Sequence, residues 1–208
     1  MAFHFEIFKK KTSETFEILN RSAFISDFYL AGGTALALWL GHRYSYDLDF
    51  FTNKQFNELK LARELIKFKK FQVEKKSEQT IIGNLNATKI SFLGYPYPLI
   101  SPLPRIKKIK IAGLLDIACM KIDAIASRGT KRDFIDVYFI VREIPLNKIL
   151  RTFKTKYARL NYNMLHIKKA LVYFADADQE PMPSMLRPVN WREVKRFFKA
   201  ELIKLKDN

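Results

Sequence analysis

Tyr29-Leu-Ala-Gly-Gly-Thr-Ala-Leu-Ala-Leu-Trp-Leu-Gly-His-Arg-Tyr-Ser-Tyr-Asp-Leu-Asp-Phe-Phe51 is the stretch from which the fold of this chain can be worked out. It has the pattern of a short strand, a glycine turn, an apolar helix and a second strand with two aspartates. Asp47 and Asp49 are two residues apart on the predicted second strand, so both side chains leave the same face, about 6–7 Å apart along the backbone. The alternate residues are expected to point the other way and pack: Tyr46, Leu48 and Phe50.

The two ends of this stretch have complementary chemistry. The free N–H groups of a helix that begins at Gly32-Gly33-Thr34 can bind phosphate, and the two carboxylates can bind a hard cation. Metal-assisted phosphoryl transfer requires both. Each feature has an ordinary alternative, because glycine pairs also mark tight turns and paired aspartates can be solvated at an edge strand. Aspartate is a poor strand former and two on one face repel each other, so their combination favours the functional interpretation.

Bulk properties limit the class of protein. The chain has 208 residues, of which 48% are hydrophobic, enough for one large domain or for a core with a helical extension. Its single cysteine, Cys119, excludes a disulfide framework and suits a reducing compartment. Lys9, Lys10 and Lys11 interrupt any signal-peptide pattern, and the apolar runs are too short to span a bilayer. We expect a soluble, cytoplasmic protein without a membrane partner.

Positive charge is unevenly distributed along the chain. There are 37 Lys and Arg residues against 21 acids, a net charge of +16. The part after Pro104 has 23 basic and 11 acidic residues, and the part before has 14 and 10. This asymmetry indicates a polyanionic partner bound mainly by the C-terminal half. The alternative is that the excess lysine serves only solubility.

Periodicity predicts an α/β half followed by a helical half. Tyr95–Pro104 has four prolines in ten residues and is expected to be an irregular crossing segment between them. The first helix is expected at 12–22, with Thr12 or Ser13 as its N-cap. The other expected elements are strands at 28–31, 47–51 and 109–111, two or three antiparallel strands from Phe71 onward, and helices at 34–40, 55–68, 114–127, 131–142, 147–158, 162–175 and 190–204.

The combination of Gly-Gly-Thr, a helix and Asp-x-Asp resembles the motif of the nucleotidyltransferase superfamily. The fuller pattern Leu-Ala-Gly-Gly-Thr…Gly-His-Arg-x-Ser-x-Asp-Leu-Asp-Phe-Phe is similar to the AbiEii/AbiGii toxin-type nucleotidyltransferases of bacterial abortive-infection and toxin–antitoxin systems. Further segments that resemble the family are Tyr95–Leu99, Asp116–Lys121, Arg128–Asp136, Tyr173–Asp178 and Pro181–Pro183. The resemblance therefore covers most of the chain.

The resemblance implies an α+β fold: a mixed nucleotidyltransferase sheet with flanking helices in residues 1–104, then an all-helical domain in 105–208 that completes the active cleft. It also implies magnesium-dependent transfer of a nucleoside monophosphate from a nucleoside triphosphate (NTP), with the 3′ end of tRNA as the expected acceptor and an antitoxin as a possible partner. Two Mg²⁺ ions are expected on Asp47 and Asp49. The catalytic residues implied are Asp47, Asp49, Lys121, Asp133 and Asp136, and the nucleotide-binding residues are Gly32, Gly33, Thr34, Arg43, Ser45, Lys121 and Arg128.

The spacing within 121–136 supports a second cluster independently. Lys121 and Arg128 are seven residues apart and share one helix face, where two cations could hold a triphosphate tail. Asp133 and Asp136 share a face of the next helix. Asp133 could orient Lys121 or Arg128, approach the metal, or act as a base.

One departure from the superfamily pattern concerns a third carboxylate. Many nucleotidyltransferases carry it on a later strand, but the expected strand Ala87–Leu93 contains no acid. Either Asp133 or Asp136 takes that role or the metals are held more loosely.

The acceptor is the least determined feature. Lys148, Arg151, Lys154 and Arg159, with Lys156, form a basic helix that could follow an RNA backbone or could be a solvated face. The same chemistry on a protein or a small-molecule hydroxyl is one alternative, and an inactive RNA-binding relative is another.

Overall fold

The computed structural model describes residues 2–160 and 162–205, and the chain divides into two compact units with the boundary in the sequence between Gly113 and Leu114. The elements of the first unit, in chain order, are η1 (Phe5–Ile7), α1 (Lys10–Arg21), η2 (Phe24–Asp27), β1 (Tyr29–Ala31), α2 (Gly32–Leu40), β2 (Leu48–Thr52), α3 (Glu58–Ile66), β3 (Phe71–Ser77), β4 (Thr80–Leu85), β5 (Thr88–Gly94), β6 (Arg105–Ile106) and β7 (Ile109–Ile111). The elements of the second unit are α4 (Leu114–Ser127), α5 (Lys131–Val141), α6 (Leu146–Lys156), α7 (Met164–Ala170), α8 (Ala175–Gln179) and α9 (Trp191–Lys204).

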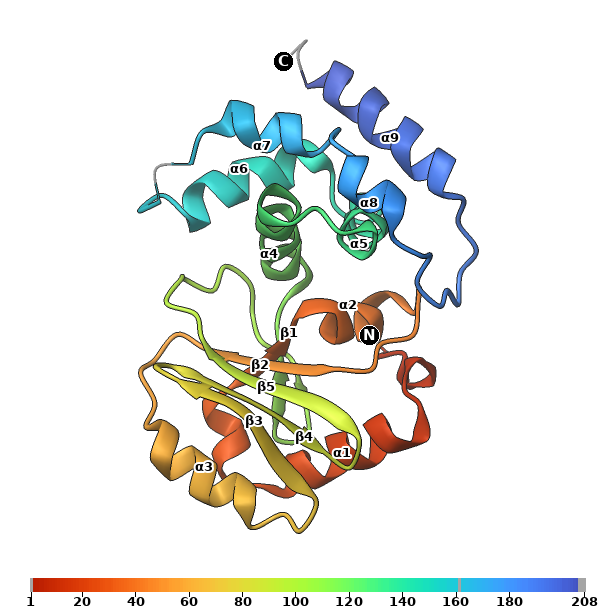
Figure 1. Cartoon of the computed structure of the whole chain (residues 1–208). Helices are drawn as coiled ribbons and strands as arrows, with labels where there is room; N and C mark the ends of the chain where they lie inside the picture. The colour runs from red at the N-terminus through yellow and green to blue at the C-terminus, as the bar shows by residue number, and fades with distance from the viewer. Residues whose placement is uncertain (1, 161, 206–208) are drawn as a thin grey trace. The chain divides into compact units, whose positions relative to one another are not determined.

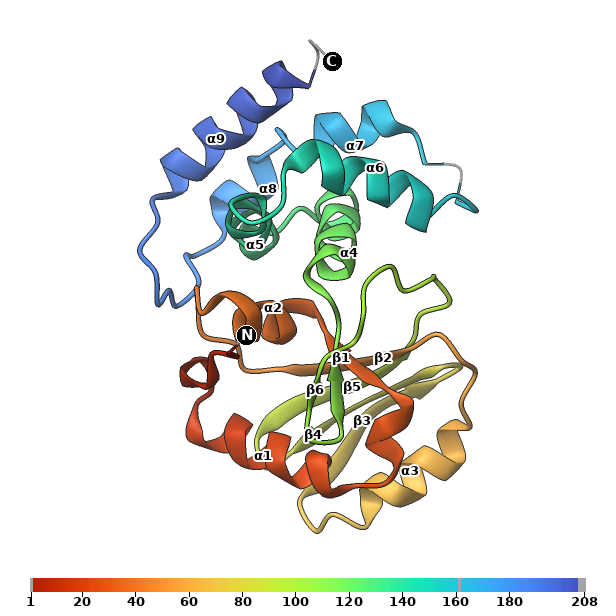
Figure 2. The same ribbon diagram turned by 180° about the vertical axis from the view of Figure 1, so that it is seen from behind.

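The first unit is built on one mixed sheet. The strand order is β3-β4-β5-β2-β1-β7-β6, with β1 antiparallel to β2 and parallel to β7, and β2 parallel to β5. Helices α1 and α3 lie on one side of the sheet and α2 lies on the other (Figures 1 and 2). Alternation along β2 buries Leu48 and Phe50 completely, and Phe50 stacks on Phe92 of β5 with ring centroids 5.2 Å apart.

Strand β3 forms one end of the sheet. Residues 72–77 of this strand are exposed, and its pairing with β4 has an irregularity between Val73 and Lys75. Its exposed sequence is Gln-Val-Glu-Lys-Lys-Ser, so charged side chains dominate this edge.

The second unit is all-helical. Helix α4 packs against α5, α6 and α7, and α5 packs against α8 and α9 (Figure 1). The fully buried ring of Phe134 on α5 contacts Phe174, Trp191 and Phe198, with centroids 5.0–5.9 Å apart. This aromatic cluster attaches the C-terminal helix to the rest of the unit. A second internal tie is the ion pair between Lys156 Nζ and Asp116 Oδ1, 2.6 Å apart and shielded from solvent.

The α+β fold and its mixed sheet are confirmed, but the expected division after Pro104 is displaced to Gly113. Residues 105–111 form a small hairpin whose second strand, β7, pairs with β1, so this segment completes the sheet instead of opening the helical half. The proline-rich segment 95–104 contains neither a helix nor a strand, as expected.

Several local expectations were wrong. Helix α1 begins after Lys9, not at Thr12 or Ser13, and Thr12 is buried within the helix. Tyr46 was expected to pack but is 39% exposed. Helix 162–175 is shorter than expected and is followed by the unpredicted α8, while β6 was also not predicted. Within the described residues, no helix has the length and apolar character needed to cross a bilayer.

Candidate active site

The antiparallel pairing of β1 with β2 brings one acid of the Asp-x-Asp pair to the glycine turn. Ala31 and Asp49 are register partners, and α2 begins at the next residue, Gly32. Gly32 has φ +69°, the left-handed region that favours glycine, and a Cβ there would lie 3.4 Å from Asp49 Oδ2. The turn and the carboxylate are therefore adjacent, as a site that binds both a phosphate and its metal ion requires.

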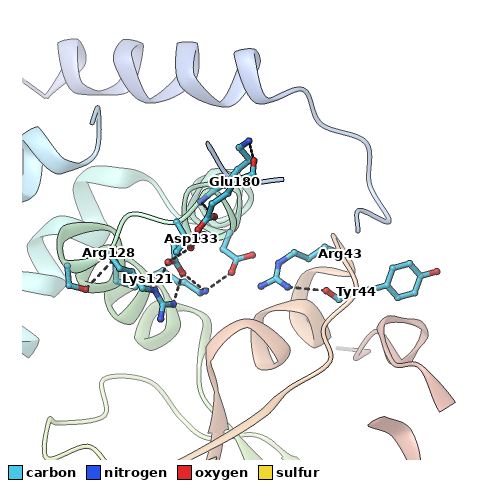
Figure 3. A network of polar contacts seen from close by, with 11 residues as sticks. Arg43, Tyr44, Lys121, Arg128, Asp133 and Glu180 are labelled. Carbon is cyan, nitrogen blue, oxygen red and sulfur yellow. Dashed lines mark hydrogen bonds and ion pairs between the residues drawn. The ribbon is translucent and has the colours of Figure 1, made fainter. Parts of the chain in front are cut away.

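Gly33 leaves room for a buried arginine. A Cβ at Gly33 would lie 2.5 Å from Arg43 Nη2, which means that the guanidinium is packed directly against the glycine backbone. Arg43 is only 5% exposed, and its Nη1 donates a hydrogen bond to the carbonyl oxygen of Tyr44 over 3.0 Å (Figure 3). A fixed positive charge thus adds to the positive end of the α2 dipole, an arrangement that attracts anions.

Thr34 joins the turn to the segment that carries the acids. Its Oγ1 lies 2.7 Å from Ser45 Oγ and also donates to the carbonyl oxygen of Asp47. Asp47 precedes the first residue of β2, so the expected strand at 47–51 begins one residue later than predicted. Asp47 and Asp49 are both partly exposed, which leaves them accessible to a ligand.

The donor set fits magnesium. Carboxylate oxygens are hard ligands, and Mg²⁺ is commonly bound through one or two carboxylates together with the phosphates of the substrate. No group of three or more Asp, Glu, His and Cys side chains suited to a metal ion is found in residues 2–160 and 162–205. Asp47 and Asp49 are thus the pair on which the magnesium prediction depends.

Strand β5 is the later strand on which many nucleotidyltransferases carry a third carboxylate, and in this chain it has a serine beside Asp49. It lies parallel to β2 with Ser91 as the register partner of Asp49, and Ser91 is 4% exposed. The sequence shows that this strand has no acid, but only the strand pairing identifies Ser91 as the neighbour of Asp49.

The second unit contains a compact ionic network centred on Lys121. The Nζ atom of Lys121 lies 2.8 Å from Asp133 Oδ1 and 2.7 Å from Asp136 Oδ2 (Figure 3). All three side chains are at least nine-tenths buried. The predicted cluster at 121–136 therefore exists, with both acids directed at the same lysine.

Asp133 is the most heavily bonded member of this network. It accepts from Arg128 Nε over 2.9 Å and from Nη2 over 3.2 Å, and from the Thr130 hydroxyl over 2.6 Å. Burial alone would raise the pKa of Asp133, but Lys121 and Arg128 outweigh burial and lower the pKa to about 2. Asp133 is therefore an anion throughout the physiological range. Arg128 is 63% exposed, so its guanidinium is also accessible to solvent.

Thr130 is a site residue that the sequence analysis missed. It is the N-cap of α5, and its side chain accepts from the backbone N–H of Asp133 while donating to the Asp133 carboxylate. The sequence Thr-Lys-Arg-Asp has the Ser/Thr-x-x-acid spacing of a capping box, which could have indicated this role. The same helix end is fixed by Glu180, whose Oε2 accepts from the Lys131 N–H over 2.8 Å (Figure 3).

The basic helix is only partly as expected. Lys148, Arg151 and Lys154 are exposed on α6, and Arg159 is exposed just beyond its end. Lys156 was grouped with them but is buried in its pair with Asp116, because α6 packs that face against α4.

Comparison with known proteins identifies the family to which the first unit is similar. The family model described as "Nucleotidyl transferase AbiEii toxin, Type IV TA system" matches residues 16–111, which include the glycine turn and both aspartates. The chain belongs to this family. An AbiEii-type chain is a nucleotidyltransferase, and the match covers most of the first unit.

Individual relatives and solved structures match nearly the whole chain, beyond the residues that the family model matches. An uncharacterised protein of Aquifex aeolicus is 39% identical over 206 residues, covering 96% of this chain and 98% of the relative. The solved structure of MenT4, a nucleotidyltransferase toxin of Mycobacterium tuberculosis, has a TM-score of 0.55 at 15% identity and covers 94% of this chain and 86% of its own. JHP933 from Helicobacter pylori has a TM-score of 0.50 at 20% identity and covers 96% of each chain. These two structures share the fold of this AbiEii-type chain.

Proposed function

We propose that this nucleotidyltransferase transfers a nucleoside monophosphate from an NTP to the 3′ end of tRNA in a magnesium-dependent reaction, as the toxin of a toxin–antitoxin or abortive-infection system. The observation that best supports nucleotidyl transfer is the surroundings of the glycine turn. Asp49 lies beside Gly32, and the Arg43 guanidinium packs against Gly33. Membership of the AbiEii family and the fold shared with MenT4 support the toxin role.

In the first unit, we assign the donor nucleotide to the N-terminus of α2. The backbone N–H groups at Gly33 and Thr34 and the Arg43 guanidinium would bind the triphosphate. Asp47 and Asp49 would hold Mg²⁺, which would supply neutralisation of the phosphate charges. Thr34 fixes Ser45 and the Asp47 backbone through its hydroxyl, and thereby fixes the approach of the acids to the turn.

In the second unit, we assign Asp133 a positioning role. A general base works best with a pKa near the working pH, and a carboxyl with a pKa of about 2 is too weak a base to remove a proton from a hydroxyl efficiently. Asp133 instead holds Lys121 and Arg128 in fixed positions. Those cations would stabilise the negative charge of the transferring phosphoryl group. Asp136 is the second acceptor for Lys121.

The RNA acceptor is supported by the charge distribution. The exposed side chains of Lys148, Arg151, Lys154 and Arg159 are proposed to bind the phosphate backbone. Each phosphate contact that they make should increase the salt dependence of RNA binding.

The test is transfer of label from each α-labelled NTP to total tRNA with Mg²⁺, comparing the wild type with Asp47→Asn. Loss of a metal-binding carboxylate should lower the rate by at least about 100-fold. Asp27→Asn, at an exposed aspartate in η2, is the matched control and should retain the wild-type rate. Equal labelling by the wild type and Asp47→Asn would remove the proposed mechanism. Labelling of a protein or a small molecule, with none of tRNA, would keep the chemistry and refute the acceptor.

A further inference from the structure

A pocket lies wholly within the helical unit, and its lining residues come from the C-terminal end of α4, from α7 and the turn after it, and from α8. Its volume is about 390 Å³, within the usual range of ligand sites, about 300–1,000 Å³. The polar side chains that matter for its chemistry are Arg128, His166, Lys169, Tyr173 and Asp176. None of them except Arg128 has a role in the nucleotidyl transfer proposed above.

The end of α4 forms one wall of this pocket. Gly129 has φ +55°, and the backbone N–H groups of Arg128 and Gly129 both bond the carbonyl oxygen of Ala124, over 2.9 and 3.1 Å. This left-handed turn ends the helix and leaves no side chain at position 129 to fill the pocket. Arg128 stands beside the turn with its side chain 63% exposed.

The opposite wall is one face of α7 and the turn that follows it. His166, Lys169 and Tyr173 are spaced three and four residues apart, so they share this face. The backbone keeps a helix-like course for one turn beyond the end of α7 at Ala170. The N–H group of Leu171 donates to the carbonyl oxygen of Ile167, and the N–H group of Tyr173 donates to that of Ala170. Tyr173 is 61% exposed, a large aromatic surface left open at the pocket.

Four polar side chains of the pocket have no polar or ring partner among residues 2–160 and 162–205. The side chains of His166, Lys169, Tyr173 and Asp176 form no hydrogen bond, ion pair or ring contact with any residue that the structure describes. An open aromatic ring next to cationic side chains is the arrangement with which proteins bind unpaired nucleotides, the ring stacking on the base and the cations pairing with the phosphate. The Asp176 carboxylate adds an acceptor for an amino or imino group of a base.

We propose that this pocket binds one unpaired nucleotide of the RNA acceptor. The base stacks on Tyr173 and donates to Asp176, while Lys169 pairs with the phosphate. This inference rests on the proposed function, in which the acceptor is RNA. The pocket suits a nucleotide of the acceptor better than a free triphosphate, because the Asp176 carboxylate would repel the higher negative charge of a triphosphate.

The first experiment measures binding of a fluorescein-labelled, single-stranded oligoribonucleotide by anisotropy, without NTP. Tyr173→Ala should weaken binding by about 5- to 150-fold, the usual range for loss of one stacked base. Tyr173→Phe should retain most of the affinity, because it keeps the ring and removes only the hydroxyl. Lys169→Gln should weaken binding and reduce its salt dependence, whereas Lys168→Gln, the same charge change outside the pocket, should do neither.

The second experiment measures the kinetics of transfer with RNA and NTP varied separately. Tyr173→Ala should raise KM for RNA by a similar factor and leave KM for NTP unchanged. A rise in KM for NTP alone would overturn the assignment to the acceptor. Equal oligoribonucleotide affinities for the wild type, Tyr173→Ala and Lys169→Gln would overturn the pocket itself.

The two proposals can fail separately. If the wild type transfers nothing to RNA, the acceptor proposed for the enzyme is wrong, and the anisotropy comparison still decides whether the pocket binds RNA. If the wild type labels tRNA and Tyr173→Ala does so with unchanged KM for RNA, the proposed function stands and the pocket inference is refuted.

Discussion

The carboxyl of Asp133 should make the stability of the helical unit depend on pH in a measurable way. Its pKa in the folded protein is about 2, below the ordinary 3.8, so folding favours the anion. A lowered pKa contributes stability that is complete above the unfolded value and is lost as the pH falls toward the folded value. This lowering of the pKa corresponds to about 2 kcal/mol of stability at pH 7 and to about 1 kcal/mol at pH 3.

The perturbation that isolates this contribution is Asp133→Asn, which keeps the shape and removes the charge. Urea unfolding should show the variant about 2 kcal/mol less stable than the wild type at pH 7, with the difference narrowing to about 1 kcal/mol at pH 3. The fluorescence of Trp191 reports unfolding of the helical unit, because its ring contacts Phe134 on α5. All proteins compared carry Trp39→Phe, which removes the tryptophan fluorescence of the first unit.

The control for this measurement is Glu143→Gln, which neutralises an exposed acid outside the ionic network and should change stability by less than about 0.5 kcal/mol. A gap between the wild type and Asp133→Asn that stays constant from pH 7 to pH 3 would refute the reasoning. It would mean that the neighbouring cations do not hold Asp133 as an anion.

Three further outcomes are expected. Gly33→Ala should force Arg43 away from the turn and raise KM for NTP by about 10- to 100-fold, as steady-state kinetics would show. Thermal unfolding should show unchanged stability, because alanine favours the helix. Lys156→Met should leave Asp116 buried without its cation and cost about 3–5 kcal/mol in urea unfolding, and unchanged stability would contradict a buried pair. Burial raises the pKa of the Cys119 thiol to about 12, so iodoacetamide at pH 8 should modify only the unfolded protein, as mass spectrometry would show.

Local periodicity predicted the helices with strong apolar patterns well. The expected ends of the helix at 114–127 agree with those of α4, because the apolar pattern is continuous and Gly129 stops it. The start of α1 could not be predicted from capping preference, because tertiary contacts overrode it. Thr15 faces inward and donates to the carbonyl oxygen of Leu85 over 3.1 Å, so the polar residues in this helix serve the sheet and not the helix end.

The partners in the site depend on contacts between distant parts of the chain. The motif predicted that Asp49 and the glycine turn belong together, but Ser91 becomes the neighbour of Asp49 only through the parallel pairing of β2 with β5. Likewise, helical spacing placed Lys121 and Arg128 on one face, whereas the packing of α4 against α5 decides that Asp133 contacts both. The burial of Lys156 has the same origin, since the charge pattern of α6 alone resembles an exposed basic row.

The exposed strand β3 has a consequence for how copies of this protein behave in concentrated solution. A terminal strand offers backbone N–H and C=O groups to any other strand, and this is the usual route to edge-to-edge aggregation. Here the irregularity at Val73 and Lys75 bends the edge, and Lys75 and Lys76 would oppose their counterparts on a second copy. Charge repulsion is screened within about 3 Å at 1 M salt, so at high ionic strength only the irregular shape of the edge would oppose such pairing.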